Sequence, residues 1–285
     1  MQKKIETVQT LLEALPFIKE FSNEIVVIKY GGSAQTSPQL KEKFAQDILL
    51  MYLVGIRPVI VHGGGHKITE MLDALQIETK FIEGQRVTSK EVMRIAEMVL
   101  SGEINSEIVS LLNSHGAKAI GVSGKDAHFI TAKAKDFAKW GLTGNITNVK
   151  SEVILNLIDE GFIPVIAPIG AAQEMGHPGF NINADLCASY VAKAIGANKI
   201  IFLTDTPGVL NKDKELLETL SQEEVEALKA NETIHGGMVP KVDACLESLN
   251  GGVSKAHIID GRIEHSMLLE LFTTEGVGTQ IVDKK

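Results

Sequence analysis

The chain has few cysteines, few aromatic residues and no long hydrophobic run. Only two of its 285 residues are cysteines, Cys187 and Cys245, and 5% are aromatic. Two cysteines in helix-like contexts do not make the disulfide framework of a small secreted domain, so we expect reduced thiols in a cytoplasmic protein. No run approaches the roughly 20 apolar residues that a helix needs to cross a bilayer, which argues against a membrane protein.

An excess of positive charge is also absent. Lysine and arginine number 28 against 36 aspartate and glutamate residues, which gives a net charge of −8 and a pI near 5.5. An acidic surface does not favour the phosphate backbone of DNA or RNA, so nucleic acid is not expected as a partner. A length of 285 residues exceeds a comfortable single core and predicts one large α/β unit or two lobes with a cleft between them.

Two glycine-rich turns are the most informative feature that is present. Each follows an apolar, strand-like run: Ile25–Ser33 reads IVVIKYGGS and Val59–His66 reads VIVHGGGH. Glycines let the chain turn sharply and bring backbone N–H groups close to an anion, and Lys29 adds a positive charge beside the first turn. Neither turn matches GxxxxGK[ST] or GxGxxG, so a P-loop and an ordinary dinucleotide site are disfavoured. The turns therefore predict an anion site on another fold.

Strand-like and helix-like segments alternate along the chain, which is typical of an α/β protein. Strands are expected at 25–30, 57–62, 163–167, 199–203, 256–260 and 280–282, and helices at 38–54, 66–75, 89–101, 104–114, 151–160, 184–195, 221–229 and 238–250. After the run AIGVSG at 119–124, a segment rich in lysine and aspartate alternates between polar and apolar residues as far as residue 149. This pattern suits short antiparallel strands, so the sheet is expected to be mixed. A polar, glycine-bearing connection at 170–179 is the expected lobe boundary.

Residues 5–21 predict an amphipathic helix ahead of the first core strand. Ile5, Val8, Leu12 and Leu15 recur at spacings of three and four, and Pro16 is expected to kink or divide the helix. The apolar stripe packs either on another subunit or on its own domain, and the pattern alone leaves both possibilities open.

Several polar residues are candidates for a functional role because of where they stand in the sequence. Lys29 ends an apolar strand, where a buried ammonium is costly without an anion or carboxylate beside it. Arg86, in the turn GQRVT, is either a fork for a carboxylate or a surface arginine. His62 and His66 flank a turn and have no third ligand at a suitable spacing, so no metal site is expected.

Two helix starts carry polar residues that capping does not fully explain. Asn181, Asn183 and Asp185 begin a predicted helix, where one capping residue suffices, so capping together with ligand positioning is the better account. Lys241 falls in the first turn of another predicted helix, where the helix dipole disfavours a cation. A bound phosphoryl group would reverse that balance.

In their order along the chain, six motifs resemble the amino-acid kinase family, in its branch that phosphorylates N-acetyl-L-glutamate. The motifs are KYGG, VHGGG, GQRVT, NINAD, TDTPGV and GGMVPK, and the resemblance runs from about residue 24 to the end. It implies a three-layer αβα sandwich with an open, mainly parallel eight-stranded sheet. It also implies an N-terminal oligomerisation helix at 1–22, an acyl-substrate-binding and dimerisation lobe at 23–180 and an ATP-binding lobe at 181–285.

The resemblance implies ATP-dependent phosphorylation of the γ-carboxylate of N-acetyl-L-glutamate to the acyl phosphate N-acetyl-L-glutamyl 5-phosphate, in arginine biosynthesis. Lys29 and Lys241 would neutralise the phosphoryl group, Asp185 would hold the two lysines, and Mg²⁺ would bind mainly through the ATP phosphates. The acyl substrate would be bound by Gly64, Gly65, Arg86, Asn181 and Asn183. ATP would be bound by Gly31, Gly32, Thr204, Asp205, Gly208, Val209, Leu210, His235 and Gly237.

Relatives that are inhibited by arginine share a kinked helix ahead of the first strand and a C-terminal pattern like that at 265–279. By that match, Glu270 would pair with the cationic end of arginine and Gly276 would offer backbone contacts. A hexamer built as a trimer of dimers, under arginine feedback, is the implied assembly.

Other functions remain open at this stage. The nearest rival is another amino-acid or carbamate kinase of the same fold. A non-catalytic arginine or nucleotide sensor belongs to a different class, and the presence of both Lys29 and Lys241 speaks against it. A dehydrogenase is a weaker third alternative.

Overall fold

The computed structural model describes residues 1–274 and 276–284, and for residues 2, 3, 6, 7 and 10 only the backbone. In this part of the chain the main sheet has eight strands in the order β12-β14-β13-β11-β1-β2-β8-β5. The six strands from β13 to β5 are parallel, β14 is antiparallel to β13, and β12 is parallel to β14. The α/β class and the mainly parallel eight-stranded sheet predicted from the sequence are confirmed.

The strands of the main sheet are short and apolar. They are β1 (Ile25–Tyr30), β2 (Arg57–His62), β5 (Ala119–Ser123), β8 (Ile163–Ala167), β11 (Lys199–Thr204), β12 (Thr219–Ser221), β13 (Lys255–Asp260) and β14 (Thr279–Val282). Three small antiparallel pairs lie outside it: β3 (Lys80–Ile82) with β4 (Gln85–Val87), β6 (Ile130–Ala134) with β7 (Gly144–Val149), and β9 (Ile169–Gly170) with β10 (Phe180–Asn181). The predicted mixture of parallel and antiparallel strands is therefore present.

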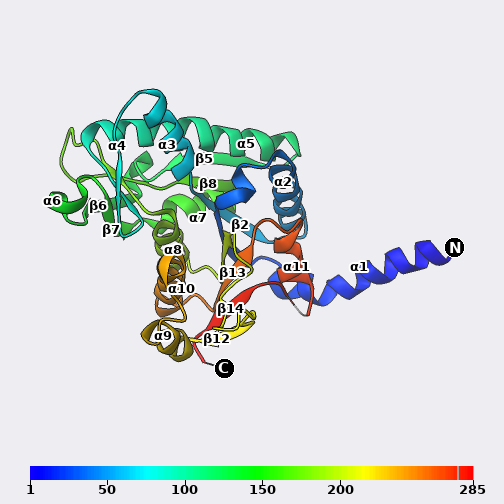
Figure 1. Ribbon diagram of the computed structural model, residues 1–285. Helices are drawn as coiled ribbons and strands as arrows, with labels where there is room; N and C mark the ends of the chain where they lie inside the picture. The colour runs from blue at the N-terminus through cyan, green and yellow to red at the C-terminus, as the bar shows by residue number, and fades with distance from the viewer. Residues whose placement is uncertain (275, 285) are drawn as a thin grey trace.

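Helices cover both faces of the sheet (Figure 1). The α-helices are α1 (Gln2–Phe21), α2 (Pro38–Leu53), α3 (Gly65–Ala74), α4 (Lys90–Glu97), α5 (Asn105–Ser114), α6 (Phe137–Trp140), α7 (Ser151–Asp159), α8 (Ala184–Ala194), α9 (Gln222–Ala230), α10 (Val239–Asn250) and α11 (Ser266–Phe272). Short 3₁₀ helices are η1 (Gly32–Gln35), η3 (Asp126–His128) and η4 (Gly236–Met238), and η2 (Met98–Ile104) is a π-helix. Among the described residues, no helix is long and apolar enough to span a membrane.

The alternation of side chains along β1 assigns the helices to layers. Tyr30 stacks on Phe44 of α2 with ring centroids 3.7 Å apart, whereas Lys29 reaches Asp185 of α8. Because successive side chains of a strand point to opposite faces, α2 and α8 lie on opposite sides of the sheet. The helices α5 and α11 contact α2, and α10 contacts α8, so three layers result.

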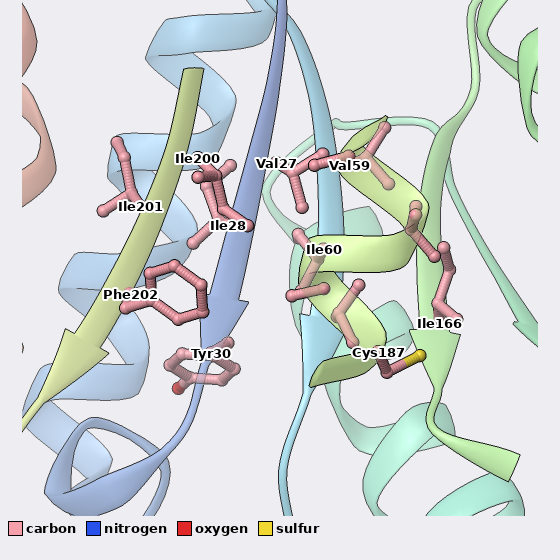
Figure 2. Packing of buried hydrophobic residues seen from close by; sticks show 14 of the residues in the cluster. Val27, Ile28, Tyr30, Val59, Ile60, Ile166, Cys187, Ile200, Ile201 and Phe202 are labelled. Atoms are coloured by element: carbon pink, nitrogen blue, oxygen red, sulfur yellow. The ribbon is translucent and has the colours of Figure 1, made fainter. Parts of the chain in front are cut away.

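The core lies between these layers and is built from β-branched residues. Val27, Ile28, Ile60 and Ile201 are fully buried, and Figure 2 shows them with Cys187 of α8. Strands of a parallel sheet are covered on both faces, which explains why their sequences are continuous apolar runs rather than alternating ones.

The predicted helices 89–101 and 104–114 form one continuous helical stretch. It runs through α4, the π-helix η2 and α5 without an intervening loop. A π-helical turn holds an extra residue, and such turns occur frequently at functional sites. Among the elements that were not predicted are the three-residue strand β12 and the short helix α11, neither of which carries a strong local pattern.

The helix α1 begins and ends close to the predicted bounds. It is a single helix from Gln2 to Phe21 that contains Pro16, so proline does not divide it. Figure 1 shows α1 projecting away from the rest of the molecule. Its predicted stripe is exposed, with Val8 at 55% and Leu12 at 61%. The chain's own domain therefore does not cover the stripe.

Candidate active site

Two lysines from distant parts of the sequence meet at one carboxylate. Nζ of Lys29 lies 3.0 Å from Oδ1 of Asp185, as a buried ion pair. Nζ of Lys241 lies 3.5 Å from Oδ2 of the same carboxylate and donates a hydrogen bond to it. The structure thus brings together the three residues that the motifs assign to catalysis.

The three residues are delivered by elements whose ends meet. Lys29 stands near the carboxyl end of β1, Asp185 in the first turn of α8 and Lys241 in the first turn of α10. Asn183 fixes the start of α8, because its Oδ1 accepts a hydrogen bond of 3.0 Å from the backbone N–H of Leu186. In open parallel sheets, ligands bind at this carboxyl edge of the strands.

Asp185 is buried and remains charged. Burial acts to raise the pKa of its carboxyl, but the Lys29 and Lys241 ammonium groups lower it more, and the pKa lies below its ordinary value. A buried carboxylate between two cations leaves an excess of one positive charge. That excess suits a ligand with negative charge.

A cavity of about 360 Å³ opens beside this cluster. Its lining includes nine of the residues predicted to act in catalysis or binding: Lys29, Gly31, Gly32, Gly64, Gly65, Arg86, Asn181, Asn183 and Asp185. Gly31 has a steric reason to be glycine, since a Cβ there would lie 2.7 Å from Nζ of Lys29. The first glycine turn and the ammonium group therefore share one small space.

The second glycine turn leads directly into a helix start at the same cavity. The helix α3 begins at Gly65, and its N-cap residue, Gly64, provides no capping side chain. The first N–H groups of a helix have no partner within the helix and carry partial positive charge. This helix start is consequently suited to an anion.

Arg86 is buried at the same helix start. Its guanidinium donates hydrogen bonds to the Gly65 carbonyl (2.8 Å) and to the hydroxyls of Thr69 (2.8 Å) and Thr79 (3.1 Å). Burial lowers the pKa of Arg86 from its ordinary value, yet a guanidinium stays charged in proteins. Three of its five N–H donors are used by these described residues, which leaves the hydrogen of Nε and one hydrogen of Nη1.

Asn181 also lines the cavity. Its amide donates a hydrogen bond of 3.1 Å to the hydroxyl of Thr88, which in turn is 3.0 Å from the hydroxyl of Thr143. These contacts orient the Asn181 side chain at the wall of the cavity. Asn183 also lines the cavity, and its capping of α8, one part of the expectation from the sequence, is confirmed.

Apart from Gly31 and Gly32, the residues predicted to bind nucleotide lie outside the lining of this cavity, around the end of β11 and beside η4. They are Thr204, Asp205, Gly208, Val209, Leu210, His235 and Gly237. Asp205 connects this group to the first glycine turn, because its Oδ1 accepts a hydrogen bond of 2.7 Å from the backbone N–H of Ser33. Val209 is buried in the core, and its backbone N–H donates a hydrogen bond of 2.8 Å to the hydroxyl of Thr279.

A second cavity, of about 420 Å³, lies where α1 meets the C-terminal region. Glu270 and Gly276 both line it. Nδ1 of His257 lies 2.5 Å from Oε1 of Glu270, and the N–H of Val277 donates to Oε2 of Glu270 at 2.9 Å. The structure therefore places both predicted effector residues at one cavity.

Two residues of this second cavity were missed by the sequence interpretation. Lys199 and His257 are buried in the otherwise apolar strands β11 and β13. Burial lowers the pKa of Lys199 to about 8, although Glu270 acts to raise it. Lys29 was identified as a candidate because a charged residue in an apolar strand is costly to bury. The same reasoning, applied to the sequences of β11 and β13, could have identified Lys199 and His257.

Among the described residues there is no group of three or more histidine, cysteine, aspartate or glutamate side chains that could hold a metal ion. His62 is instead buried in a hydrogen-bonded network of the scaffold, with Nδ1 2.9 Å from the Gly63 carbonyl and Nε2 3.2 Å from Asn105.

The site combines two paired ammonium groups, glycine amides and an arginine at the carboxyl edge of a parallel sheet. This arrangement defines the phosphotransferase class of site. In such a site, fixed positive charge surrounds the phosphoryl group that is transferred. The chain belongs to the amino acid kinase family, whose model matches residues 24–260. Membership of a kinase family implies the use of ATP.

Curated relatives cover nearly the whole chain. The acetylglutamate kinase of Sulfurimonas denitrificans is 84% identical over 281 residues, which is 99% of either chain. The acetylglutamate kinase of Nitratiruptor sp. is 69% identical over 282 residues, again 99% of either chain. The resemblance that the six motifs indicate is confirmed by these relatives.

Solved structures share the fold. The N-acetylglutamate synthase of Neisseria gonorrhoeae, complexed with coenzyme A and N-acetyl-glutamate, superposes with a TM-score of 0.87 at 27% identity. The match covers 98% of this chain but 64% of that one, so this chain spans less than two thirds of the synthase. A carbamate kinase from Giardia lamblia bound to AMP-PNP superposes with a TM-score of 0.72 at 19% identity, covers 93% of this chain and 100% of that one, and shows the fold alone.

Proposed function

We propose that this chain catalyses the ATP-dependent phosphorylation of the γ-carboxylate of N-acetyl-L-glutamate, giving the acyl phosphate N-acetyl-L-glutamyl 5-phosphate in arginine biosynthesis. The observation that carries the proposal is the contact of Lys29 and Lys241 with one carboxylate beside the glycine-lined cavity. The 84% identity to an acetylglutamate kinase supports the choice of substrate. The two buried, free cysteines fit a reducing, cytoplasmic environment.

The reaction needs alignment and charge neutralisation rather than a base. A carboxylate is ionised at pH 7 and is already a nucleophile, so no proton has to be removed. In the proposed reaction a carboxylate oxygen attacks the γ-phosphorus of ATP, and the bond from that phosphorus to the β–γ bridging oxygen breaks. Lys29 and Lys241 compensate the charge on the transferred group, and Asp185 keeps both ammonium groups beside it.

The substrate is positioned by the other end of the cavity. The start of α3 at Gly64 and Gly65 offers N–H groups, and the positive charge of Arg86 beside it would attract a carboxylate of the substrate. Asn181, which also lines the cavity, would contact the acetamide. Held this way, the acceptor meets ATP from one direction, which lowers the entropic part of the barrier.

The nucleotide is proposed to extend from the first glycine turn toward the end of β11 and η4. Gly31 and Gly32 would bind its phosphates, and Mg²⁺ bound with ATP would supply further charge neutralisation. An acyl-substrate lobe at 23–180 and an ATP lobe at 181–285 would close on each other, with one lysine from each.

Arginine is proposed as an inhibitor that binds the second cavity. Glu270 would pair with its guanidinium, and the cationic residues Lys199 and Lys255 in the lining suit its carboxylate. Phe17, Glu20 and Phe21 of α1 line the same cavity, so α1 would couple arginine binding to assembly of a hexamer. A second structure of the Neisseria gonorrhoeae synthase, complexed with coenzyme A and L-arginine, has a TM-score of 0.82 at 26% identity and supports this choice of ligand.

The test is a coupled assay of ATP consumption with acetylglutamate, glutamate, aspartate and carbamate as acceptors, with and without arginine. We expect turnover with acetylglutamate, trapping of the acyl phosphate by hydroxylamine as a hydroxamate, and inhibition by arginine. Faster turnover with another acceptor would instead indicate a different kinase of this fold. Binding of arginine or nucleotide without turnover of any acceptor would indicate a sensor.

A further inference from the structure

A buried chain of polar groups lies behind the second glycine turn, on the face of the sheet opposite Asp185. His62 is paired with Tyr30 in the register of β2 and β1, so it points toward the α2 and α5 side. The amide Nδ2 of Asn105, the first residue of α5, lies 3.2 Å from Nε2 of His62 and 2.9 Å from the carbonyl of Val165. His62 is 0% exposed and Asn105 is 5% exposed.

These contacts define the protonation state of His62. The Val165 carbonyl can only accept, so the Asn105 atom beside it is the amide nitrogen, whose two hydrogens reach Val165 and His62. Nε2 of His62 must then be an unprotonated acceptor. The ring hydrogen sits on Nδ1 and is donated to the Gly63 carbonyl at 2.9 Å.

The hydrogen bond from His62 fixes the first peptide of the glycine turn. The Gly63 carbonyl accepts from Nδ1 of His62 and from Nε2 of Gln35 at 3.4 Å, and the Gly63 N–H donates to the Tyr30 carbonyl at 2.7 Å. Both polar groups of Gly63 are therefore engaged on the scaffold side. The next residues, Gly64 and Gly65, line the cavity at the start of α3.

The π-helix η2 approaches the same turn. A Cβ on Gly64 would lie 2.3 Å from Cδ1 of Ile104 and 2.7 Å from Cδ2 of Leu100, both in η2. Asn105 follows η2 directly, and its own close neighbour is another glycine, since a Cβ on Gly121 would lie 1.8 Å from Oδ1 of Asn105. The extra residue of the π-turn thus sets both the apolar contact with Gly64 and the direction of the Asn105 amide.

We infer that His62 and Asn105, with the π-helix η2 that presents Asn105, are positioning residues for the glycine turn Gly63–Gly65. They hold the N–H groups of Gly64 and Gly65 at the angle that the acyl substrate requires, without touching the substrate. The inference rests on the proposed function, in which this turn binds the acyl substrate. It separates His62 from the metal-binding and acid–base roles that histidines commonly take.

The substitution Asn105→Asp tests the inference with little change in size. A carboxylate cannot donate to the Val165 carbonyl or to Nε2 of His62, so the His62 ring must change its protonation or turn. We expect KM for acetylglutamate to rise about 10- to 100-fold, the range that corresponds to leaving a buried polar group unsatisfied. KM for ATP is expected to change less than about 3-fold, because the printed hydrogen bonds of His62 and Asn105 reach Gly63 and Val165 but neither Gly31 nor Gly32.

Asn113→Asp is the matched control on the same helix. Nδ2 of Asn113 donates to the Ala119 carbonyl at 3.1 Å, so this variant also loses a bond from α5 to a strand carbonyl, but far from the glycine turn. We expect a lower Tm with KM for acetylglutamate unchanged. An equal rise of KM in both variants would overturn the inference, because it would reduce Asn105 to general support of the fold.

Two further variants of His62 separate its two nitrogens. In His62→Asn the side-chain amide can still donate from the place of Nδ1, whereas in His62→Gln a polar atom remains only near the place of Nε2. We expect His62→Asn to retain KM for acetylglutamate better than His62→Gln. The reverse order would contradict the assigned role of the bond to Gly63.

Nitrogen-15 NMR of the histidine rings in the unsubstituted protein gives a readout that does not depend on folding of any variant. We expect His62 to show the Nδ1–H tautomer, with and without acetylglutamate. A ring protonated on Nε2 would overturn the inference even if the kinase activity is present. Absence of activity toward acetylglutamate in the unsubstituted protein would overturn the proposed function, and the tautomer would still test the network.

Discussion

Lys241 is held less tightly by Asp185 than Lys29 is. Its Nζ lies 3.5 Å from Oδ2 of Asp185, against 3.0 Å between Nζ of Lys29 and Oδ1, and its side chain is 21% exposed rather than 10%. Lys29 is therefore a fixed part of the site, whereas Lys241 has room to move toward a transferred phosphoryl group. In a reaction governed by charge, the lysine that gains contacts in the transition state affects the rate most.

Lys241→Ala is accordingly expected to lower kcat about 10²- to 10³-fold, as removal of one well-placed transition-state donor does. KM for acetylglutamate should change little, because Lys241 lies outside the lining of the cavity around Gly64 and Arg86. Steady-state kinetics with both substrates measure this. Lys229→Ala is the control, since it removes a lysine from a surface ion pair with Asp243 of α10. Equal losses in kcat and in acetylglutamate affinity would count against the role.

Local sequence signals were sufficient for the parts of the site that depend on strand ends and glycine turns. The run of β-branched residues before Gly31 predicts β1, and the charge of Lys29 at its end predicts a partner. The start of α8 was predictable because Asn183 is a good N-cap. These features depend on residues close in sequence, where propensity and sterics act directly.

Features that depend on distant contacts could not be predicted in the same way. The π-helix η2 and the bond from Asn105 to His62 arise where α5 packs against β2 and β8, and nothing in the periodicity of 98–104 signals an extra residue in the turn. Strand β12 has three residues and is stabilised by pairing with β14. Lys199 and His257 come together only because β11 and β13 are adjacent in the sheet.

The exposed stripe of α1 gives a prediction about assembly. Val8→Glu combined with Leu12→Glu places charges on two apolar side chains that are more than half exposed. If the stripe packs on another subunit, the particle mass should fall from a hexamer to a dimer, and so should that of a chain lacking residues 1–21. Light scattering after gel filtration measures the mass. Glu13→Gln, elsewhere on α1, is the control and should leave the mass unchanged. If the two-residue variant and the truncated chain also keep the mass of the unsubstituted protein, the assembly role of α1 is refuted.

Glu270 is expected to determine arginine affinity. Burial acts to raise the pKa of its carboxyl, but the hydrogen bond with His257 and the N–H of Val277 lower it more, so the pKa lies below its ordinary value and the group is charged at pH 7. Glu270→Gln removes this charge and should weaken arginine binding about 10- to 100-fold, as loss of a charge-assisted bond does. Titration calorimetry with arginine measures the effect.

The control for this variant is Glu247→Gln, which breaks an ion pair with Lys193 outside the second cavity. Arginine binding should be unchanged in it. Equal affinity in the Glu270 variant and the unsubstituted protein would place the guanidinium elsewhere.

Asp47 gives a prediction about stability and pH. It is 2% exposed on α2, and its Oδ1 lies 2.5 Å from Nδ1 of His265, the residue before α11. Burial raises its pKa to about 6, although the hydrogen bond and charge of His265 and the charge of Lys43 act to lower it. The folded state therefore binds this proton more strongly than the unfolded state, whose value is near 3.8.

The contribution of Asp47 to stability is consequently complete below pH 3.8 and is lost as the pH rises through about 6. A difference of about two pKa units corresponds to roughly 3 kcal/mol between pH 4 and pH 7. Asp47→Asn keeps the shape of the side chain and an acceptor for His265 but removes the titration. Urea unfolding at several pH values should show the unsubstituted protein losing stability relative to this variant as the pH rises. Asp159→Asn, at an exposed site near Arg57, is the control. Parallel curves of unfolding free energy against pH for the Asp47 variant and the unsubstituted protein would contradict this prediction. They would mean that the Asp47 carboxyl stays charged in the folded protein over the pH range measured.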